Sequence, residues 1–282
     1  MAGPQPMRAP LFVPGERTDR LPSALASPAD AVILDLEDSV AAAAKEPARR
    51  AVTDAVRSAP AGAHLLVRIN GLDSPWFADD LAVLHPVLHR LAGVLLPKTA
   101  AATDVDELAA ALPDGPSVVP IVESAGGVLE ASRIAAARRV SQLLFGPADL
   151  GAELGVAVTP AGRELAHARS AVVLAAAAAG LARPLDGPHL ALGDPDGLRT
   201  GCLAARELGF GGKAAIHPEQ LPAVREVFAP SEQEVSWART VLAAYRESSG
   251  PGAVRLDDGT FVDEPVARRA EQIIAEHSAA AS

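Results

Sequence analysis

Cysteine, basic charge and long apolar runs are all scarce in this chain, and each shortage excludes a class of protein. Cys202 is the only cysteine among 282 residues, so neither an internal disulfide nor a cysteine-rich zinc site can form. The 25 basic residues are outnumbered by 35 acidic ones, and the formal net charge is −10. Such a surface repels phosphodiester backbones and anionic lipid. We therefore expect neither nucleic acid nor a membrane as a partner.

The longest apolar run is too short to cross a bilayer. It covers residues 171–182, whereas a spanning helix needs about 20 apolar residues. Its alanine-rich composition predicts a buried helix instead. The first ten residues contain no apolar core of the kind that a secretory signal has. We expect a soluble protein in a reduced, cytoplasmic compartment.

Several familiar motifs are absent or incomplete. The chain has no Gly-x-Ser-x-Gly elbow and no Gly-x-Gly-x-x-Gly that opens a helix after the first strand. The segment Gly209–Lys213 resembles a phosphate loop, but it lacks the hydroxyl residue after lysine and precedes a strand. His85 and His89 have the i, i+4 spacing of metal ligands on a helix, yet Pro86 lies between them and no glutamate follows His85. We expect a solvated face there.

Short apolar segments alternate with alanine-rich helical segments such as 40–58 and 103–112. The apolar segments lack the alternation of a half-exposed strand, as expected of strands covered on both faces. About eight such units predict an α/β fold, a parallel (β/α)8 barrel, although an open doubly wound sheet would alternate similarly. The predicted strands are Leu11–Val13, Ala31–Leu36, Leu65–Ile69, Gly93–Leu96, Val118–Val122, Gln142–Phe145, Arg183–Leu185 and Ala214–Ile216.

Nearly every predicted strand is followed by a charged or hydrogen-bonding residue. In chain order these are Glu37 and Asp38, Arg68 and Asn70, Lys98, Glu123, Asp149, Asp186 and His217. Any strand that ends in a loop can show this, but its recurrence at seven of eight strands favours a barrel, which gathers the ends into one ring where barrel enzymes carry out their chemistry.

The chain continues beyond the eight units. We expect a flexible N-terminus over residues 1–10, a barrel domain over 11–222 and a C-terminal helical extension over 223–282. A helix over 230–245 would begin with Ser231 as its N-cap and Glu234 as the capping-box partner. A Gly-Pro-Gly break at 250–252, a turn at 257–259 and a last helix over 264–277 follow. The extension is expected to be too short for its own core, and to pack on the barrel or reach a neighbouring subunit.

Glu123 and Asp149 are the strongest candidates for a metal site. Each comes just after a predicted strand, and neighbouring barrel strands would bring them to one rim. Two carboxylates without cysteine or histidine partners suit a hard cation such as Mg²⁺, with water and substrate as the other ligands. Alternatively, one is a helix N-cap and the other a surface acid.

Arg68 and three acids form a second group of candidates. Arg68 at a strand end offers a planar fork for a substrate carboxylate, or it makes a structural ion pair. Asp35, Glu37 and Asp38 are crowded together and need a positive partner. A metal's outer coordination shell would supply it, and so would Arg49 or Arg50.

The chain resembles the citrate lyase beta-subunit-like branch of the HpcH/HpaI aldolase/citrate lyase family, whose members are CoA-ester lyases. Eight segments in the family's order carry the resemblance, from residue 11 to residue 265: Leu11–Gly15, Ala31–Val40, Val67–Gly71, Leu96–Lys98, Ile121–Ser124, Phe145–Leu150, Gly212–Pro218 and Val262–Pro265.

This resemblance implies roles for single residues. Glu123 and Asp149 match the Mg²⁺ ligands, Arg68 matches the arginine that binds the keto-acid carboxylate, and Glu123 borders the same substrate pocket. Asp263 matches an acid or base that acts in an adjoining subunit's site, which implies a homo-oligomer, most often a trimer. Asp38 matches a residue near the metal's water ligands. Together with Asp35 and Glu37 it would belong to the outer coordination shell of the metal.

The implied reaction is Mg²⁺-dependent cleavage or formation of a β-hydroxyacyl-CoA thioester, such as malyl-, citramalyl- or citryl-CoA, with an acyl-CoA and a keto acid as the other side of the equilibrium. Lys98 is an alternative Schiff-base nucleophile, but a structural or phosphate-contacting role is favoured. Two other functions stay open: a non-catalytic or acyl-carrier-dependent beta subunit of a citrate lyase complex, and a metal-dependent aldolase for free pyruvate-type substrates. A thioesterase side activity is also compatible with the sequence.

Overall fold

Eight parallel strands form one curled sheet, and their order in the sheet is their order in the chain. The computed structural model describes residues 7–247, 254–256 and 259–280. The predicted α/β fold with eight parallel strands is confirmed. The strands are β1 (Leu11–Pro14), β2 (Val32–Asp35), β3 (Leu65–Arg68), β4 (Gly93–Leu96), β5 (Ser117–Val122), β6 (Leu144–Phe145), β7 (Leu185–Asp186) and β8 (Gly212–Lys213).

The last strand differs from the prediction. Gly212–Lys213 pairs with β7, whereas the predicted strand was 214–216. The later segment hydrogen-bonds to the other edge of the sheet, because Ala215 forms a parallel bridge with Leu11 and its carbonyl accepts a hydrogen bond from Phe12 N at 2.8 Å. Backbone hydrogen bonds therefore join the first strand to the segment that follows β8.

Part of the expected flexible N-terminus belongs to the folded unit. Residues 1–6 lie outside the described residues, but Met7 and Ala9 are buried. The Asp30 carboxylate accepts hydrogen bonds from Arg8 N and Ala9 N at 2.8–3.1 Å, and Lys213 N donates to Arg8 O at 2.9 Å. These contacts hold residues 7–10 against the sheet.

The centre of the curled sheet is filled with apolar side chains from nearly every strand. Because side chains alternate between the two faces of a strand, one residue in two points inward. A single buried cluster gathers them: Met7, Ala31, Ile33, Leu66, Leu95, Val119, Ile121, Leu144, Leu185 and Ala214. The sheet thus encloses a packed core.

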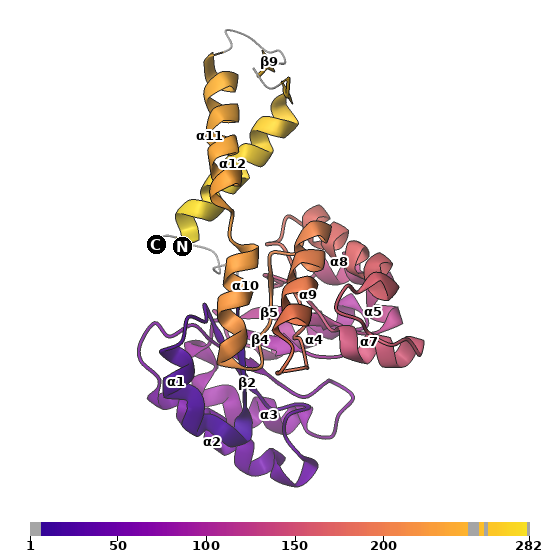
Figure 1. Cartoon of the computed structure of the whole chain (residues 1–282). Helices are drawn as coiled ribbons and strands as arrows, with labels where there is room; N and C mark the ends of the chain where they lie inside the picture. The colour runs from indigo at the N-terminus through magenta and orange to yellow at the C-terminus, as the bar shows by residue number, and fades with distance from the viewer. Residues whose placement is uncertain (1–6, 248–253, 257–258, 281–282) are drawn as a thin grey trace. The chain divides into compact units, whose positions relative to one another are not determined.

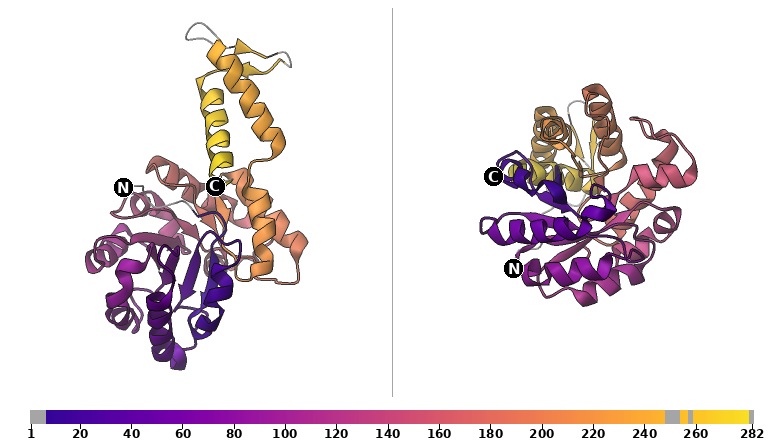
Figure 2. Two further views of the ribbon diagram at one scale, coloured as in Figure 1. Left: turned by 90° about the vertical axis from the view of Figure 1, so that its left-hand side faces the viewer. Right: turned by 90° about the horizontal axis from the view of Figure 1, so that it is seen from below.

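Helices cover the outer face of the sheet (Figures 1 and 2). The predicted helical segments 40–58 and 103–112 are found, with somewhat different ends, as α2 and α4. The helices are α1 (Leu21–Leu25), α2 (Lys45–Ser58), α3 (Phe77–Leu84), α4 (Ala102–Ala111), α5 (Ala125–Leu129), α6 (Ala131–Ala135), α7 (Pro147–Leu154), α8 (Ala166–Ala178), α9 (Pro195–Leu208) and α10 (Leu221–Phe228), with 3-10 turns at Gly15–Arg20, Ala42–Ala44, His85–Arg90, Arg163–Leu165 and Pro218–Gln220.

Two candidate motifs have structural roles. Gly209 ends α9 in a left-handed conformation, and Gly212–Lys213 of the apparent phosphate loop is strand β8. His85 and His89 lie exposed on a 3-10 turn, as the sequence predicted. Among the described helices, none is both long and apolar enough to cross a membrane.

The chain divides into two units, Met1–Arg225 and Glu226–Ser282, and the boundary lies within α10. The second unit contains α11 (Glu232–Glu247), α12 (Glu264–Ala280) and an antiparallel pair, β9 (Val254–Arg255) with β10 (Phe261–Val262). Ser231 and Glu234 make the predicted capping box, since Glu234 N donates to Ser231 Oγ at 3.2 Å and Ser231 N donates to the Glu234 carboxylate at 2.7 Å.

The expectation that the extension has no core of its own is wrong. The two long helices pack on each other and on β10, and they bury a separate apolar cluster: Val235, Ala238, Val241, Leu242, Val262, Ala267, Ala270 and Ile273. The predicted break at 250–252 and residues 257–258 of the predicted turn lie outside the described residues.

Candidate active site

Three charged side chains extend the inward-facing rows of the core at the carboxyl ends of their strands. Asp35, Arg68 and Glu123 each come two residues after a core residue of the central cluster, at 33, 66 and 121. The two-residue period of a strand directs them to the same interior face. The parallel register also places Asp35 directly opposite Arg68. The strand pattern alone therefore brings these groups to one end of the core.

Arg68 forms the centre of the charge network. Its Nε and Nη2 atoms donate to the two carboxylate oxygens of Asp35, both at 2.7 Å, and Nη1 lies 2.8 Å from Glu37 Oε2. Burial opposes ionisation of Asp35, but the hydrogen bonds and charge of Arg68 outweigh it and hold the pKa of that carboxyl below its usual value. Two of the five N–H groups of the guanidinium thus hydrogen-bond to Asp35, and the contact of Nη1 with Glu37 is an ion pair without a hydrogen bond.

Of the two alternatives for the positive partner of the acid cluster, the one that names Arg49 or Arg50 is wrong. Arg49 Nε is 2.6 Å from the buried Asp80, and Arg50 pairs with Glu46 one helical turn away on α2. Both arginines lie on α2, outside the sheet, where they contact acids of the helical layer. Arg68 and Lys98 form ion pairs with the acid cluster instead.

Lys98 contacts two acidic residues at the end of the sheet. Its Nζ atom donates to Glu37 Oε1 at 2.8 Å, and its backbone N donates to Glu123 Oε1 at 2.6 Å. The hydrogen bond to Glu37 raises the pKa of Lys98, so the amine stays protonated and is a poor Schiff-base nucleophile. A structural role, which the sequence favoured, fits these contacts. The ion pair with Glu37 has no sequence signal beyond the position of Lys98 at a strand end.

Glu123 is buried and has little room on one side. Gly146, just after β6, faces it so closely that a Cβ atom at that position would lie 2.4 Å from Glu123 Cβ and 2.5 Å from Oε2. Burial raises the pKa of Glu123 to about 8; the charges of Asp149 and Glu37 add to the rise, while the Lys98 N–H and Arg68 oppose it. The carboxyl is therefore poised to exchange a proton for a cation near neutral pH.

Asp149 lies in the first turn of α7 and faces the same cavity as Glu123. The cavity has a volume of about 460 Å³, and its polar lining is Asp35, Asp38, Ser39, Arg68, Glu123 and Asp149. We call it the carboxylate pocket. Apolar residues complete its wall: Phe12, Pro14, Ile121, Leu144, Gly146, Pro147, Ala148, Pro188, Leu190 and Ile216. The predicted metal ligands and the predicted carboxylate-binding arginine therefore share one cavity.

The residues of the pocket fit a divalent cation. In the part of the chain that the structure describes, five carboxyl groups (Asp35, Glu37, Asp38, Glu123 and Asp149) are grouped with three cationic side chains, Arg68, Lys98 and Lys45. Among the described residues, no three His, Cys, Asp or Glu side chains form a ready-made metal cluster. A cation here would thus be held by Glu123 and Asp149 with water and substrate oxygens as its other ligands, the coordination that Mg²⁺ favours.

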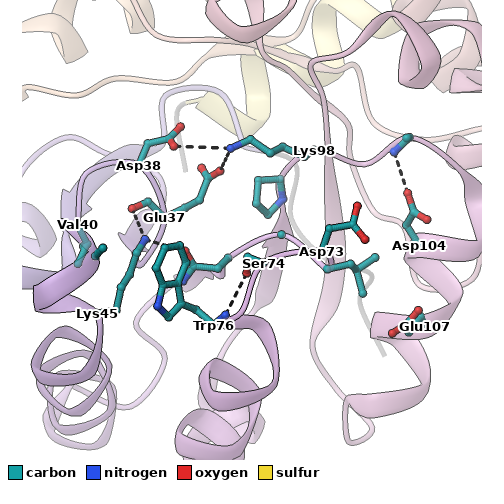
Figure 3. A pocket seen from close by; sticks show the side chains of 16 residues that line it. Glu37, Asp38, Val40, Lys45, Asp73, Ser74, Trp76, Lys98, Asp104 and Glu107 are labelled. Atoms are coloured by element: carbon teal, nitrogen blue, oxygen red, sulfur yellow. Dashed lines mark hydrogen bonds and ion pairs between the residues drawn. The ribbon is translucent and has the colours of Figure 1, made fainter.

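A second cavity of about 640 Å³ adjoins the pocket at Asp38 (Figure 3). We call it the Trp76 cavity. Lys45 lines this cavity. Its Nζ atom donates to Leu36 O, Glu37 O and Asn70 Oδ1 at 2.7–2.8 Å. The same atom lies 4.9 Å from the centre of the Trp76 ring. These bonds fix the backbone from which Glu37 and Asp38 project.

Asp263 belongs to the second unit, where it precedes α12. Its Oδ1 atom accepts a hydrogen bond from Val266 N at 3.1 Å, so the side chain caps the helix. The side chain is half-buried. The lining of the carboxylate pocket consists of first-unit residues and does not include Asp263.

Comparison with known proteins places these features in a family. The chain is 37% identical to a (3S)-malyl-CoA thioesterase of Cereibacter sphaeroides, across 98% of this chain and 96% of that protein. It is 36% identical to the L-malyl-CoA/beta-methylmalyl-CoA lyase of Rhodobacter capsulatus, across 95% and 93% of the two chains.

Among solved structures, protein CitE from Mycobacterium tuberculosis, in complex with magnesium, acetoacetate and coenzyme A, superimposes with a TM-score of 0.82; the identity is 37%, and 98% of each chain is covered. The family model described as HpcH/HpaI aldolase/citrate lyase matches residues 8–218. The chain belongs to the HpcH/HpaI aldolase/citrate lyase family, as the eight sequence segments indicated.

Proposed function

We propose that this protein is a Mg²⁺-dependent CoA-ester lyase. It would cleave a β-hydroxyacyl-CoA such as malyl-CoA into an acyl-CoA and a keto acid, or catalyse the reverse condensation. The observation that carries the proposal is one cavity that combines Glu123, Asp149 and Arg68 with an excess of negative charge. The lyase and thioesterase relatives and the CitE complex with magnesium and coenzyme A support it.

The bond changes assign work to each side chain. In cleavage the β-hydroxyl loses its proton, the Cα–Cβ electron pair moves to Cα, and the Cβ–O group becomes a carbonyl; the thioester enolate then takes a proton at Cα. Bound Mg²⁺ supplies Lewis acidity to the hydroxyl oxygen and the forming carbonyl. Glu123 and Asp149 would hold the cation, and Arg68 would use the N–H groups that do not bond to Asp35 to orient the substrate carboxylate.

Asp35, Glu37 and Asp38 act around these groups. Asp35 fixes the plane of the Arg68 guanidinium through two hydrogen bonds. Glu37 bridges Arg68 and Lys98. Asp38 is exposed at the mouth of the pocket, where it is placed to accept hydrogen bonds from water ligands of the cation. All three thus support the groups that contact the metal and the substrate.

Asp263 is the proposed proton donor to the enolate, or the base in the condensing direction. It would act from the C-terminal extension of a neighbouring subunit, in a homotrimer or a higher homo-oligomer. This assignment rests on the match of residues 262–265 to the family segment. The proposed domains are a closed (β/α)8 barrel over residues 11–222 and a helical extension over residues 223–282. The proposed location of the protein is the cytoplasm.

Product analysis distinguishes the lyase from a thioesterase. The purified chain is incubated with malyl-CoA and Mg²⁺, and the products are identified by mass spectrometry. Carbon–carbon cleavage yields acetyl-CoA and glyoxylate, whereas thioester hydrolysis yields malate and free CoA. The proposal predicts acetyl-CoA as the first product and its loss in excess chelator; malate and CoA alone, or turnover without a divalent cation, would contradict it.

Two variants test the assigned roles. Asp263→Asn keeps an acceptor for the α12 cap, so the fold should persist while proton transfer, and with it kcat, falls. Glu264→Gln changes the neighbouring exposed acid and is the matched control. Activity of the isolated chain on CoA esters excludes an obligate acyl-carrier-dependent subunit, and undiminished activity of Asp263→Asn on a free keto acid would favour the aldolase alternative.

A further inference from the structure

The backbone at Lys98 has an unusual conformation. Its φ angle is +55°, and Arg139 is the other non-glycine residue with a positive φ among the described residues. The left-handed region is disfavoured for side chains with a Cβ atom, so such a residue persists only where its surroundings hold it. A residue with a disfavoured backbone conformation next to a charged cavity suggests that the conformation has a role in the site.

The residues around Lys98 hold this conformation. The next residue, Thr99, is buried and donates from Oγ1 to Leu96 O at 2.8 Å and from N to Ile121 O at 3.3 Å. Gly127 leaves the space that the turn needs, because a Cβ atom there would lie 2.4 Å from Thr99 O. The chain on the C-terminal side of Lys98 is therefore fixed between two strands and a helix.

The conformation directs two groups of one residue at two acids. The Lys98 N–H meets Glu123 Oε1 at 2.6 Å, and Nζ meets Glu37 Oε1 at 2.8 Å. The first contact occupies one oxygen of Glu123. The second gives Glu37 a cationic partner besides Arg68, whose Nη1 contacts the other oxygen of Glu37 at 2.8 Å.

We propose that Lys98 is a positioning residue whose left-handed backbone sets Glu123 for cation binding and whose ammonium group keeps Glu37 from competing for Arg68. The proposal rests on the Mg²⁺-dependent function above. The backbone part governs metal affinity. The side-chain part governs the affinity for the substrate carboxylate, since a Glu37 held by Arg68 alone opposes the entry of a second carboxylate.

A graded series at position 98 isolates the backbone part. Lys98→Gly, Lys98→Ala and Lys98→Val all lose the ammonium group and differ in how well they tolerate a positive φ, glycine best and β-branched valine worst. Calorimetric titration with Mg²⁺ alone should give dissociation constants that rise in that order, at least tenfold from glycine to valine. Equal constants within twofold would overturn the proposal.

Two controls keep a folding defect apart from a positioning defect. Arg139→Val places the same residue on a left-handed backbone outside the lining of the carboxylate pocket, so it should lower the unfolding temperature without changing the Mg²⁺ dissociation constant. If Lys98→Val does not fold, the comparison of Lys98→Gly with Lys98→Ala still decides, with an expected difference of threefold or more. An equal loss of Mg²⁺ affinity in Arg139→Val would count against the proposal.

Steady-state kinetics test the side-chain part. Lys98→Gly should raise the KM for the keto acid in condensation at least fivefold while kcat stays within threefold, and Lys98→Arg should restore most of the KM. A fall in kcat with an unchanged KM would refute this part. The two proposals fail differently: if the parent chain binds no Mg²⁺, the proposed function fails, whereas a parent that binds Mg²⁺ with a flat series refutes only the role of Lys98.

Discussion

Binding of Mg²⁺ should release a proton from Glu123. The buried carboxyl has a pKa of about 8 against an ordinary value of 4.5, so about nine molecules in ten carry the proton at pH 7 in the metal-free protein. A cation that binds the carboxylate has to displace that proton. Below pH 8 the apparent affinity for Mg²⁺ should therefore rise about tenfold for each unit of pH, and above pH 8 it should level off.

Calorimetry measures this linkage directly. Titration of Mg²⁺ at pH 7 in buffers of different ionisation enthalpy gives the number of protons released, and we expect about 0.9 for each ion bound. Glu123→Gln cannot release the proton and should bind Mg²⁺ weakly, with little dependence on pH. Glu130→Gln changes a half-buried acid outside the lining of the carboxylate pocket; it is the control and should behave as the parent does. Equal affinity of the parent at pH 6 and pH 8, without proton release, would refute the reasoning.

Three further predictions follow from contacts around the site. Gly146→Ala should cost about 1–3 kcal/mol of unfolding free energy and weaken Mg²⁺ binding, because its methyl group would overlap Glu123; Gly126→Ala, where a Cβ meets no atom within 4 Å, should do neither. Asp80→Ala should cost about 3–5 kcal/mol in urea unfolding, because it leaves the buried Arg49 without its partner at 2.6 Å. Metal-free protein should lose stability as the pH rises from about 4.5 to about 8, because the raised pKa of Glu123 means that the folded state binds more protons than the unfolded state over that window; a melting temperature that rises with pH there would contradict this.

The sequence predicted the sheet well because its strands carry a strong local signal. Buried parallel strands are short apolar runs between turn residues, so seven of the eight predicted segments overlap the observed strands. The eighth was misplaced because β8 is Gly212–Lys213, a glycine and a buried lysine that no apolar pattern marks. A two-residue strand is defined by its partners, and partners are not visible in one sequence.

The sequence predicted which residues lie at the site, but it did not predict which of them form ion pairs and hydrogen bonds with one another. Residues at strand ends were identified because parallel strands deliver their ends to one rim. The alternative that Arg49 or Arg50 pairs with the acids failed because it depended on which face of α2 meets the sheet. The contacts of Lys98 could not be predicted at all, since a left-handed φ at a lysine leaves no trace in composition or spacing.

The most direct test of the account is the location of the metal in crystals. Crystals grown with Mn²⁺ in place of Mg²⁺ would show the ion by its anomalous scattering. The account predicts one peak in the carboxylate pocket, within coordination distance of the carboxylates of Glu123 and Asp149. A peak elsewhere, or an ion held by only one of these two side chains with the other turned away, would contradict it.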